Sequence, residues 1–209
     1  MCQLFGPEAL DDNPHHEKND DGRRQLALSA HRTLGRHEAK PADEDMDPSV
    51  LLLWADYLAG SGQPHSTPLP AAWHFCDNEL DADVCANLVL AGRKCATAPS
   101  LWFFELRGAV PPSAGNLDIV TNWKGIARCI IQTTAIHIVR FRDVTAEHAR
   151  LEGEGDGSLE SWRTVHWAYY QRELKGTKYA PTEEMPIVCE YFEMVFPKGG
   201  PTSKWSRHA

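Results

Sequence analysis

Hydrophobic residues between positions 47 and 60 recur every three or four residues, the spacing that places side chains on one face of an α-helix. Asp47 suits the N-cap, Pro48 the first helical position and Gly60 the helix end. The expected apolar face consists of Leu51, Trp54, Tyr57 and Leu58. The proline-rich residues 63–72 then predict an extended linker, because proline blocks regular backbone pairing.

A second helix is predicted to end at Gly92, since acidic residues lie near its start and Arg93 and Lys94 follow its last turn. Its apolar repeat consists of Leu80, Val84, Leu88 and Ala91. Two more helices are predicted over residues 145–152 and 158–174.

β-Branched and aromatic residues dominate positions 117–122, 125–141 and 185–196. Their stiff side chains favour strands over helices. The order of helices and strands along the chain predicts an α+β fold, with a mixed, mostly antiparallel sheet that curls into a small β-barrel flanked by helices.

Composition and charge limit the folded part and its partners. Hydrophobic residues make up 42% of the 209 residues, enough for one domain, whereas residues 1–46 are polar and charged. We expect a disordered tail at 1–46, a helix and linker at 47–72, the folded domain at 73–197 and a flexible tail at 198–209. The net charge of −8 argues against a duplex DNA partner, but it permits a small pocket for one nucleotide or a short single strand.

The six cysteines include no Cys-x-x-Cys pair, so neither a disulfide framework nor a zinc site is expected. The N-terminus lacks the basic start and apolar run of a signal peptide, and no apolar stretch approaches the roughly 20 residues that span a bilayer. We therefore expect a soluble, cytoplasmic protein with reduced thiols, no bound metal and no membrane contact.

The stretch EGEGDGSLESWR, residues 152–163, alternates acidic residues with glycines. In a calcium loop of the EF-hand type, Glu152, Glu154 and Asp156 would take the first, third and fifth positions. The twelfth position must supply a bidentate carboxylate, but it is Arg163, and this excludes such a calcium loop.

Two interpretations of this acidic loop remain. The simpler one is helix capping, in which Asp156 or Ser158 stabilises the start of the next helix. However, three carboxylates within five residues repel one another unless cations lie nearby. Arg163 and His166 are three residues apart on the predicted helix, so we expect them to face and neutralise the acids, which would make the loop part of a site.

A second candidate lies in LAGRKCATAPSL, residues 90–101, where Lys94 and Thr97 follow a predicted helix end. A lysine whose pKa is lowered by burial can act as a base and activate a hydroxyl nucleophile. The alternative is that Lys94 only complements the helix dipole and that Thr97 only opens a strand.

Three segments together strongly resemble the ASCH domain family over residues 73–196: LVLAGRKCATAPSL, the stretch from CIIQTTAIHIVRF through EGEGDGSLESWRTVH, and MPIVCEYFEMVF. The resemblance implies a PUA-like fold and an association with RNA. The pattern EGEGD-SL-x-x-WR-x-x-H is typical of one subgroup. That subgroup usually has glycine where Cys76 stands, and often tyrosine where Phe104 stands.

Small ASCH proteins of another subgroup are N4-acetylcytidine amidohydrolases with a G-x-K-x-x-T motif and a glutamate. The resemblance implies that Lys94, Thr97 and Glu152 are catalytic: Lys94 would take the proton of Thr97, and Glu152 would exchange a proton with the leaving amine. Residues expected to bind the nucleoside or RNA are Trp102, Trp123, Glu154, Asp156, Arg163 and His166. No metal or cofactor is required.

Two alternatives remain for the same residues. Other members of the present subgroup have been connected with cleavage of single-stranded RNA, which would make the cleft a nuclease site. The third possibility is a module that binds a nucleotide or RNA without chemistry. The expected partner is therefore a modified nucleoside or single-stranded RNA.

Overall fold

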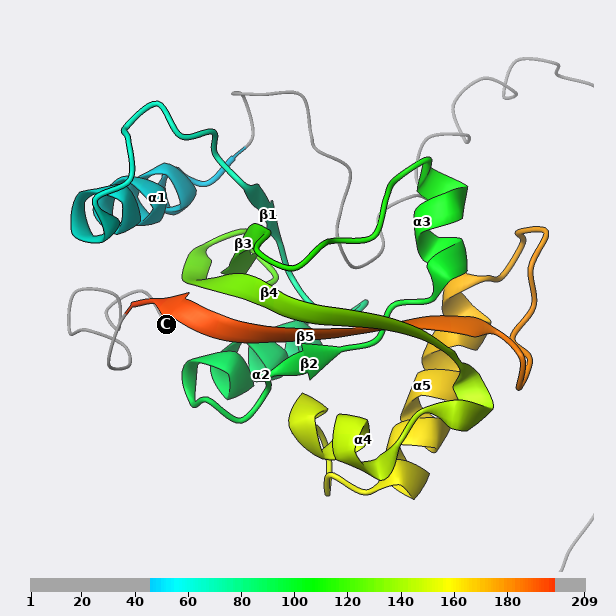
Figure 1. The fold of residues 1–209 in the computed structure, drawn as a ribbon. Helices are drawn as coiled ribbons and strands as arrows, with labels where there is room; N and C mark the ends of the chain where they lie inside the picture. The colour runs from blue at the N-terminus through cyan, green and yellow to red at the C-terminus, as the bar shows by residue number, and fades with distance from the viewer. Residues whose placement is uncertain (1–45, 198–209) are drawn as a thin grey trace, which may run out of the picture. The chain divides into compact units, whose positions relative to one another are not determined.

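A computed structural model of the chain describes residues 46–197 (Figure 1). The predicted tails at 1–46 and 198–209 lie outside these residues, apart from Met46. The described elements are α1 (Pro48–Ser61), β1 (Ala71–Trp73), α2 (Glu79–Leu90), β2 (Ala96–Thr97), α3 (Leu101–Arg107), β3 (Leu117–Thr121), β4 (Ala127–Arg140), a 3₁₀-helix (Phe141–Asp143), α4 (Ala146–Glu152), α5 (Leu159–Glu173) and β5 (Pro186–Phe196).

The five strands form one sheet in the order β1-β3-β4-β5-β2. β1 pairs with β3 in parallel, and the other neighbouring strands are antiparallel. The predicted α+β fold with a mostly antiparallel sheet is confirmed. The sheet is not closed into a barrel, since β1 and β2 form its two edges within residues 46–197.

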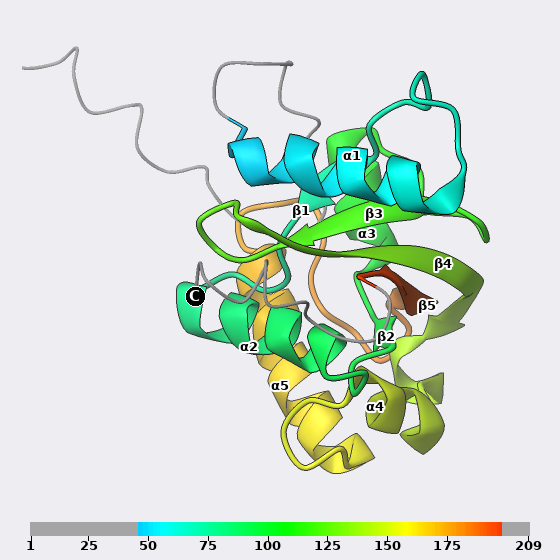
Figure 2. The ribbon, with the colours of Figure 1, turned by 90° about the vertical axis from the view of Figure 1, so that its left-hand side faces the viewer.

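Different helices cover the two faces of the sheet, because neighbouring residues of a strand point in opposite directions. Ile119 and Ile130 pack with the buried side chains of α1, whereas Val120 and Ile131 pack with those of α2. Figures 1 and 2 show α1 on one side of the sheet and α2, α4 and α5 on the other. The candidate site lies on the second side.

The start of α1 follows the prediction. The Asp47 side chain accepts a hydrogen bond of 2.9 Å from the backbone N–H of Ser49, and Pro48 is the first helical residue. The helix extends to Ser61 and ends on Gly62, two residues beyond the expected Gly60.

Helix α2 is present as predicted, but its repeat of large apolar residues is not its buried face. Leu80 is 73% exposed and Val84 is 48% exposed. The side chains packed on the sheet are instead Ala82, Cys85, Ala86 and Val89. Alanine and cysteine contribute little to a pattern read from leucine and valine, so the periodicity indicated the wrong face.

The short elements β1 and α3 were not predicted. β1 lies within the expected linker, where its three residues pair with Asp118, Ile119 and Val120 of β3. Helix α3 follows the cap residue Ser100, whose hydroxyl accepts a hydrogen bond of 3.0 Å from the backbone N–H of Phe103. Its seven residues span only two turns, too few to display a helical period.

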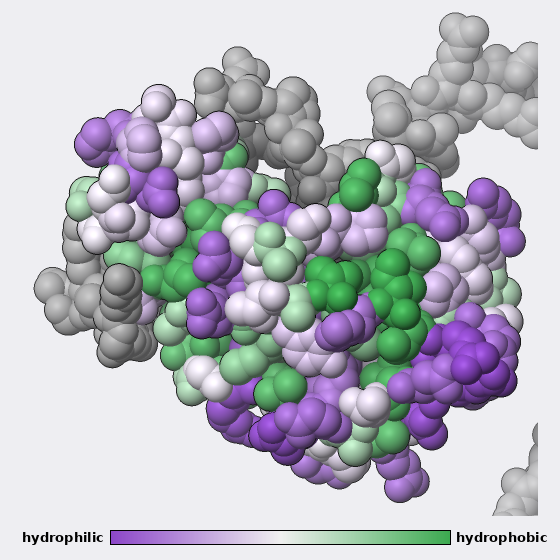
Figure 3. Space-filling model, viewed as in Figure 1, coloured by the Kyte–Doolittle hydropathy of each residue, from purple (hydrophilic) through white to green (hydrophobic). Residues whose placement is uncertain are grey.

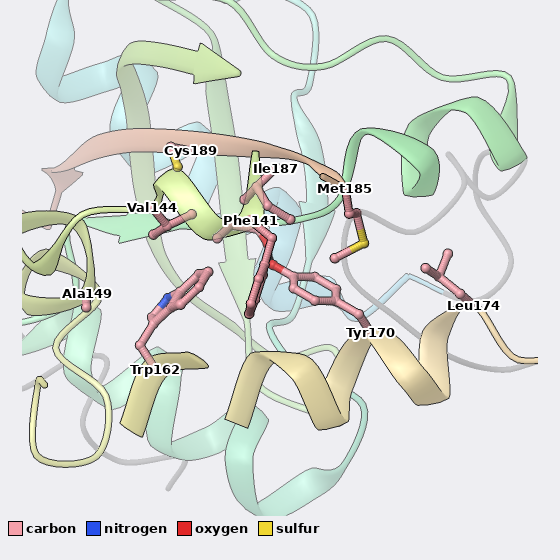
Figure 4. Close-up of a cluster of buried hydrophobic side chains, with 10 residues drawn as sticks. Phe141, Val144, Ala149, Trp162, Tyr170, Leu174, Met185, Ile187 and Cys189 are labelled. Carbon is pink, nitrogen blue, oxygen red and sulfur yellow. Dashed lines mark hydrogen bonds between the residues drawn. The ribbon is translucent and has the colours of Figure 1, made fainter. Parts of the chain in front are cut away.

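Helix α5 is anchored by an aromatic cluster (Figure 4). Trp162 and Tyr170 project from α5 to either side of Phe141, with ring centroids 5.5 and 6.1 Å from that of Phe141. The Tyr170 hydroxyl also donates a 2.5 Å hydrogen bond to the carbonyl of Ala98, just beyond β2. This packing fixes the face of α5 that carries His166.

The surface in Figure 3 shows apolar side chains in its middle and hydrophilic side chains at its margins. The described residues include exposed large apolar side chains on and after α3 and on β4, namely Leu106, Val110 and Ile138. Between residues 46 and 197, no helix has both the length and the apolar character needed to cross a membrane.

A half-buried carboxyl group, that of Glu173, joins α3 to α5. The Ser100 hydroxyl and the Tyr169 hydroxyl each donate a hydrogen bond of 3.1 Å to Glu173. Burial raises the pKa of Glu173 to about 6, although these two hydrogen bonds act in the opposite direction. The ionised form is therefore disfavoured in the folded protein.

This raised pKa predicts a pH-dependent stability difference between the wild type and Glu173→Gln. Because the folded-state pKa of about 6 exceeds the ordinary value of 4.5, the contribution of Glu173 is fully present below pH 4.5 and is lost as the pH rises through 6. In urea denaturation at pH 4.5, 6 and 7.5, the free energy of unfolding of the variant, relative to that of the wild type, should rise by about 2 kcal/mol across this range. Parallel stability profiles would contradict the prediction.

Candidate active site

The turn after α2 places Lys94. Gly92 adopts a left-handed conformation with φ of 69°, and the backbone N–H groups of Arg93 and Lys94 both donate to the carbonyl of Leu88. The next residue, Cys95, then donates its N–H to the carbonyl of Leu151 in α4 at 2.8 Å. These bonds end the helix and turn the Lys94 side chain into the protein.

The end of α4 approaches this turn closely at Gly153. Gly153 has φ of 67°, and a Cβ atom placed there would lie 2.5 Å from the backbone oxygen of Arg93 and 2.9 Å from its carbonyl carbon. Only glycine fits this contact without moving one of the two backbones. Through it, Glu152, the last residue of α4, is brought next to Lys94.

Lys94 forms a buried ion cluster with two glutamates. Its Nζ atom donates to Glu152 Oε2 at 2.9 Å and to Glu154 Oε1 at 2.5 Å. The side chains of Lys94 and Glu152 are each 1% exposed, and that of Glu154 is 27% exposed. The remaining face of the ammonium lies 5.0 Å from the centre of the Phe75 ring, a cation–π distance.

The two carboxylates determine the charge of Lys94. Burial alone lowers the pKa of Lys94, but Glu152 and Glu154 outweigh it and hold that pKa well above its ordinary value. The predicted role of Lys94 as a base requires a lowered pKa, whereas the structure gives the opposite direction. Lys94 is therefore a permanent cation in this arrangement rather than a base.

Glu152 is surrounded by donors. Besides Lys94, its carboxylate accepts hydrogen bonds from Trp162 Nε1 at 2.8 Å and from His148 Nε2 at 3.1 Å. His166 Nε2 lies 3.5 Å away. Burial alone raises the pKa of Glu152, but Lys94, His166 and His148 hold it well below its ordinary value.

A cavity of about 290 Å³ opens beside the ion cluster. Thr97, Glu152, Glu154 and His166 line it, and Lys94 lies behind the two glutamates. Its apolar walls include Trp73, Phe75, Val84, Leu88, Phe103 and Trp162. Of the three predicted catalytic residues, the structure thus brings Thr97 and Glu152 to one cavity and Lys94 to its wall.

Thr97 lies in β2, opposite Glu190 of β5. Its hydroxyl forms no hydrogen bond with any residue between 46 and 197, and the hydrogen bonds of Lys94 Nζ in this part of the chain go to Glu152 and Glu154. The expected direct contact between Lys94 and Thr97 is therefore absent from the described residues. The Thr97 hydroxyl is available to a ligand in the cavity.

Four of the six residues expected to bind the ligand lie outside the cavity lining, namely Trp102, Trp123, Asp156 and Arg163. Trp102 stacks on the Tyr179 ring with centroids 4.6 Å apart, and the ring of Trp123 lies 4.7 Å from that of His74. Arg163 donates to the backbone carbonyl of Arg142 at 2.9 Å. The expectation that Arg163 neutralises the acidic loop is wrong, because Lys94 occupies that position.

The acidic loop combines both interpretations proposed for it. Asp156 is part of a cap, since its carboxylate accepts a 2.8 Å hydrogen bond from the backbone N–H of Ser158, the N-cap of α5. Glu154 instead faces the cavity, and His166 is oriented by stacking on Trp162 with centroids 4.2 Å apart. In this loop, the carboxylate of Asp156 therefore has a structural role, whereas that of Glu154 is available for chemistry.

The site contains two residues to which sequence reasoning assigned no role. His148 lies four residues before Glu152 on α4, a spacing that places both on one helix face. Trp162 lies four residues before His166 on α5, and its indole N–H adds a polar contact to Glu152. Among residues 46–197, no three His, Cys, Asp or Glu side chains are grouped so as to hold a metal ion.

The close approach at Gly153 predicts different effects for two glycine substitutions. Gly157→Ala adds a Cβ in open space at φ of 74° and should cost about 1–2 kcal/mol for the left-handed conformation alone. Gly153→Ala adds the same conformational cost and a clash with the Arg93 backbone, so urea denaturation should show at least about twice that loss. Equal losses would mean that the contact is not restrictive.

The ion cluster predicts a large stability cost for Lys94→Met. Removing one partner of a buried ion pair leaves an uncompensated charge, so the free energy of unfolding should fall by about 3–5 kcal/mol. The double variant Lys94→Met/Glu152→Gln removes both charges and should recover much of the loss.

The matched control for this experiment is Lys124→Met, since the Lys124 side chain is 71% exposed. It should change stability by less than about 0.5 kcal/mol. Wild-type stability in Lys94→Met, or no recovery in the double variant, would be evidence against the cluster.

Comparisons with known proteins agree with the described architecture. The chain is similar to the crystal structure of an ASCH domain from Lactobacillus crispatus JV V101, with 31% identity, a TM-score of 0.65, and coverage of 71% of this chain and 95% of that chain. It is also similar to a protein from Enterococcus faecalis V583 described under the family model DUF984, with 28% identity, a TM-score of 0.65, and coverage of 70% and 88%. A comparison with curated proteins found no match. The ASCH domain model matches residues 71–196, more than half of the chain, and this protein therefore belongs to the ASCH domain family.

Proposed function

We propose that this protein is a hydrolase that removes the acyl group from a modified cytidine of the N4-acetylcytidine kind. The observation that carries the proposal is the buried cluster of Lys94, Glu152 and Glu154 in the wall of a cavity that Thr97 also lines. The cavity thus combines a hydroxyl nucleophile, carboxylates and a fixed cation, the groups that acyl transfer requires.

The size and charge of the cavity favour a nucleoside over a polyanion. At about 290 Å³ the cavity is at the lower end of the range of about 300–1,000 Å³ found for small-molecule sites. Its acidic lining residues, Asp77, Asp81, Glu152, Glu154 and Glu190, outnumber its basic ones, His166 and Arg172. Such a lining repels phosphate, whereas the apolar walls suit a planar base.

Glu154 fits the acid–base role better than Glu152. Both oxygens of Glu152 already accept hydrogen bonds, from Lys94 on one side and from Trp162 and His148 on the other. Glu154 Oε2 has no hydrogen bond with the described residues, and its side chain is partly exposed to the cavity. We therefore assign proton transfer to Glu154 and the positioning of Lys94 to Glu152.

The reaction then proceeds in two steps. Thr97 Oγ attacks the amide carbon while Glu154 takes the hydroxyl proton. Lys94, in the wall, offsets the negative charge that develops on the amide oxygen. The carbon–nitrogen bond breaks, and Glu154 returns the proton to the leaving nitrogen of the base. Water then hydrolyses the ester on Thr97, which releases the carboxylic acid and restores the hydroxyl.

Incubation of the full chain with N4-acetylcytidine, followed by chromatography of the nucleosides, tests the proposal. The wild type should release cytidine and acetate in equal amounts. Thr97→Val should lower kcat by at least about 100-fold with near wild-type stability, and Glu154→Gln, assayed under conditions in which it is folded, should lower kcat by about 10²–10⁴-fold. Glu160→Gln, exposed on α5, is the matched control and should retain full turnover.

Parallel incubations separate the alternatives. Cleavage of a labelled single-stranded RNA without release of cytidine, with or without a divalent metal, would replace the proposal by a nuclease. Recovery of bound N4-acetylcytidine or RNA unaltered would replace it by a binding module. A larger loss of turnover in Glu152→Gln than in Glu154→Gln at equal stability would reverse the assignment of the two glutamates.

A further inference from the structure

Two thiols face each other in the wall of the cavity. Cys76 Sγ lies 3.6 Å from Cys85 Sγ, and both residues line the cavity. Cys85, in α2, is buried, whereas Cys76, in the loop before α2, is half-buried. A ligand or a small oxidant that enters the cavity can therefore reach Cys76.

The backbone at Cys76 is unusual. Its φ of 59° lies in the left-handed region, and Cys76 is the only residue other than glycine with a positive φ among residues 46–197. Glycine adopts this conformation without steric cost, whereas a side chain does not. The side chain at this strained position carries the sulfur that faces Cys85.

The Cys85 thiol is also connected to the ion cluster. Cys85 Sγ donates a hydrogen bond of 3.3 Å to Glu154 Oε1, the same oxygen that accepts from Lys94. A change in the oxidation state of Cys85 therefore removes one of the donors that hold Glu154.

We propose that Cys76 and Cys85 form a reversible disulfide in the cavity wall when the protein meets a peroxide. Bond formation requires the sulfur atoms to approach from 3.6 Å to about 2.05 Å, a movement within the reach of side-chain rotation in the loop that carries Cys76. The disulfide joins the loop before α2, which carries Cys76, to Cys85 in α2.

The oxidation balances with one molecule of hydrogen peroxide. The Cys76 sulfur attacks a peroxide oxygen and the oxygen–oxygen bond breaks. The leaving hydroxide takes the Cys76 thiol proton and departs as water, and a sulfenic acid remains on Cys76. The Cys85 sulfur then attacks Cys76 Sγ while its proton passes to Glu154, and the departing hydroxide takes that proton and leaves as a second water. The peroxide is reduced and the two thiols are oxidised by two electrons in total.

The test uses the full chain, first reduced, then exposed to hydrogen peroxide and alkylated with iodoacetamide under denaturing conditions. Mass spectrometry of the wild type should show alkylated cysteines falling from six to four, and a peptide pair linked through Cys76 and Cys85. Dithiothreitol should restore six. Cys76→Gly should give no linked pair, and Cys95→Ser, which removes a half-buried thiol outside the cavity lining, should still give it.

The outcomes separate this proposal from the proposed function. A linked pair in the wild type and in Cys95→Ser supports it, and turnover of N4-acetylcytidine should then fall at least tenfold on oxidation and recover with dithiothreitol. The effect on turnover rests on the proposed function, but the linked pair does not, so a protein without turnover still tests the disulfide. Persistent alkylation of both Cys76 and Cys85 after peroxide, or a sulfinic acid on Cys76 without a link, would overturn the proposal.

Discussion

The structure of the site depends on one ammonium group held between two carboxylates inside the protein. Lys94 is charged because Glu152 and Glu154 lie against it, and Glu152 is ionised because Lys94, His148 and His166 surround it. None of these charges could be buried alone, since an isolated ion in the interior is costly. The cluster therefore requires the turn after α2, the end of α4 and the half of α5 that carries Trp162 and His166 to meet at one point.

Backbone contacts make that meeting possible across 58 residues of sequence. Cys95 bonds to the carbonyl of Leu151 and also accepts from the backbone N–H of Phe192, so the segment after Lys94 is held between α4 and β5. Gly153 allows the two backbones to touch. Because the donors and acceptors are rigid main-chain groups, the geometry around Lys94 is set before any ligand enters.

Local patterns predicted the elements that have strong local signals. The strands rich in β-branched residues and the long helix α5 lie close to their expected positions. The strand β1 and the helix α3 are too short for a period, and their stability comes from pairing with β3 and from the cap at Ser100. The role of Lys94 could not be read from the chain, because its pKa depends on two glutamates that the fold brings from distant positions. Burial alone lowers the pKa of a lysine, so that it can act as a base. A buried lysine beside two anions has a raised pKa and stays a cation.

NMR of protein labelled at the lysine Cε position can show whether Lys94 remains a buried cation at the site. The resonance of Lys94, assigned by its loss in Lys94→Arg, is followed against pH. Because the pKa of Lys94 is raised, this resonance should keep the chemical shift of a protonated amine above pH 10.5. A Lys94 resonance that titrates below pH 9 would show that the cluster does not hold Lys94 protonated and that Lys94 can act as a base.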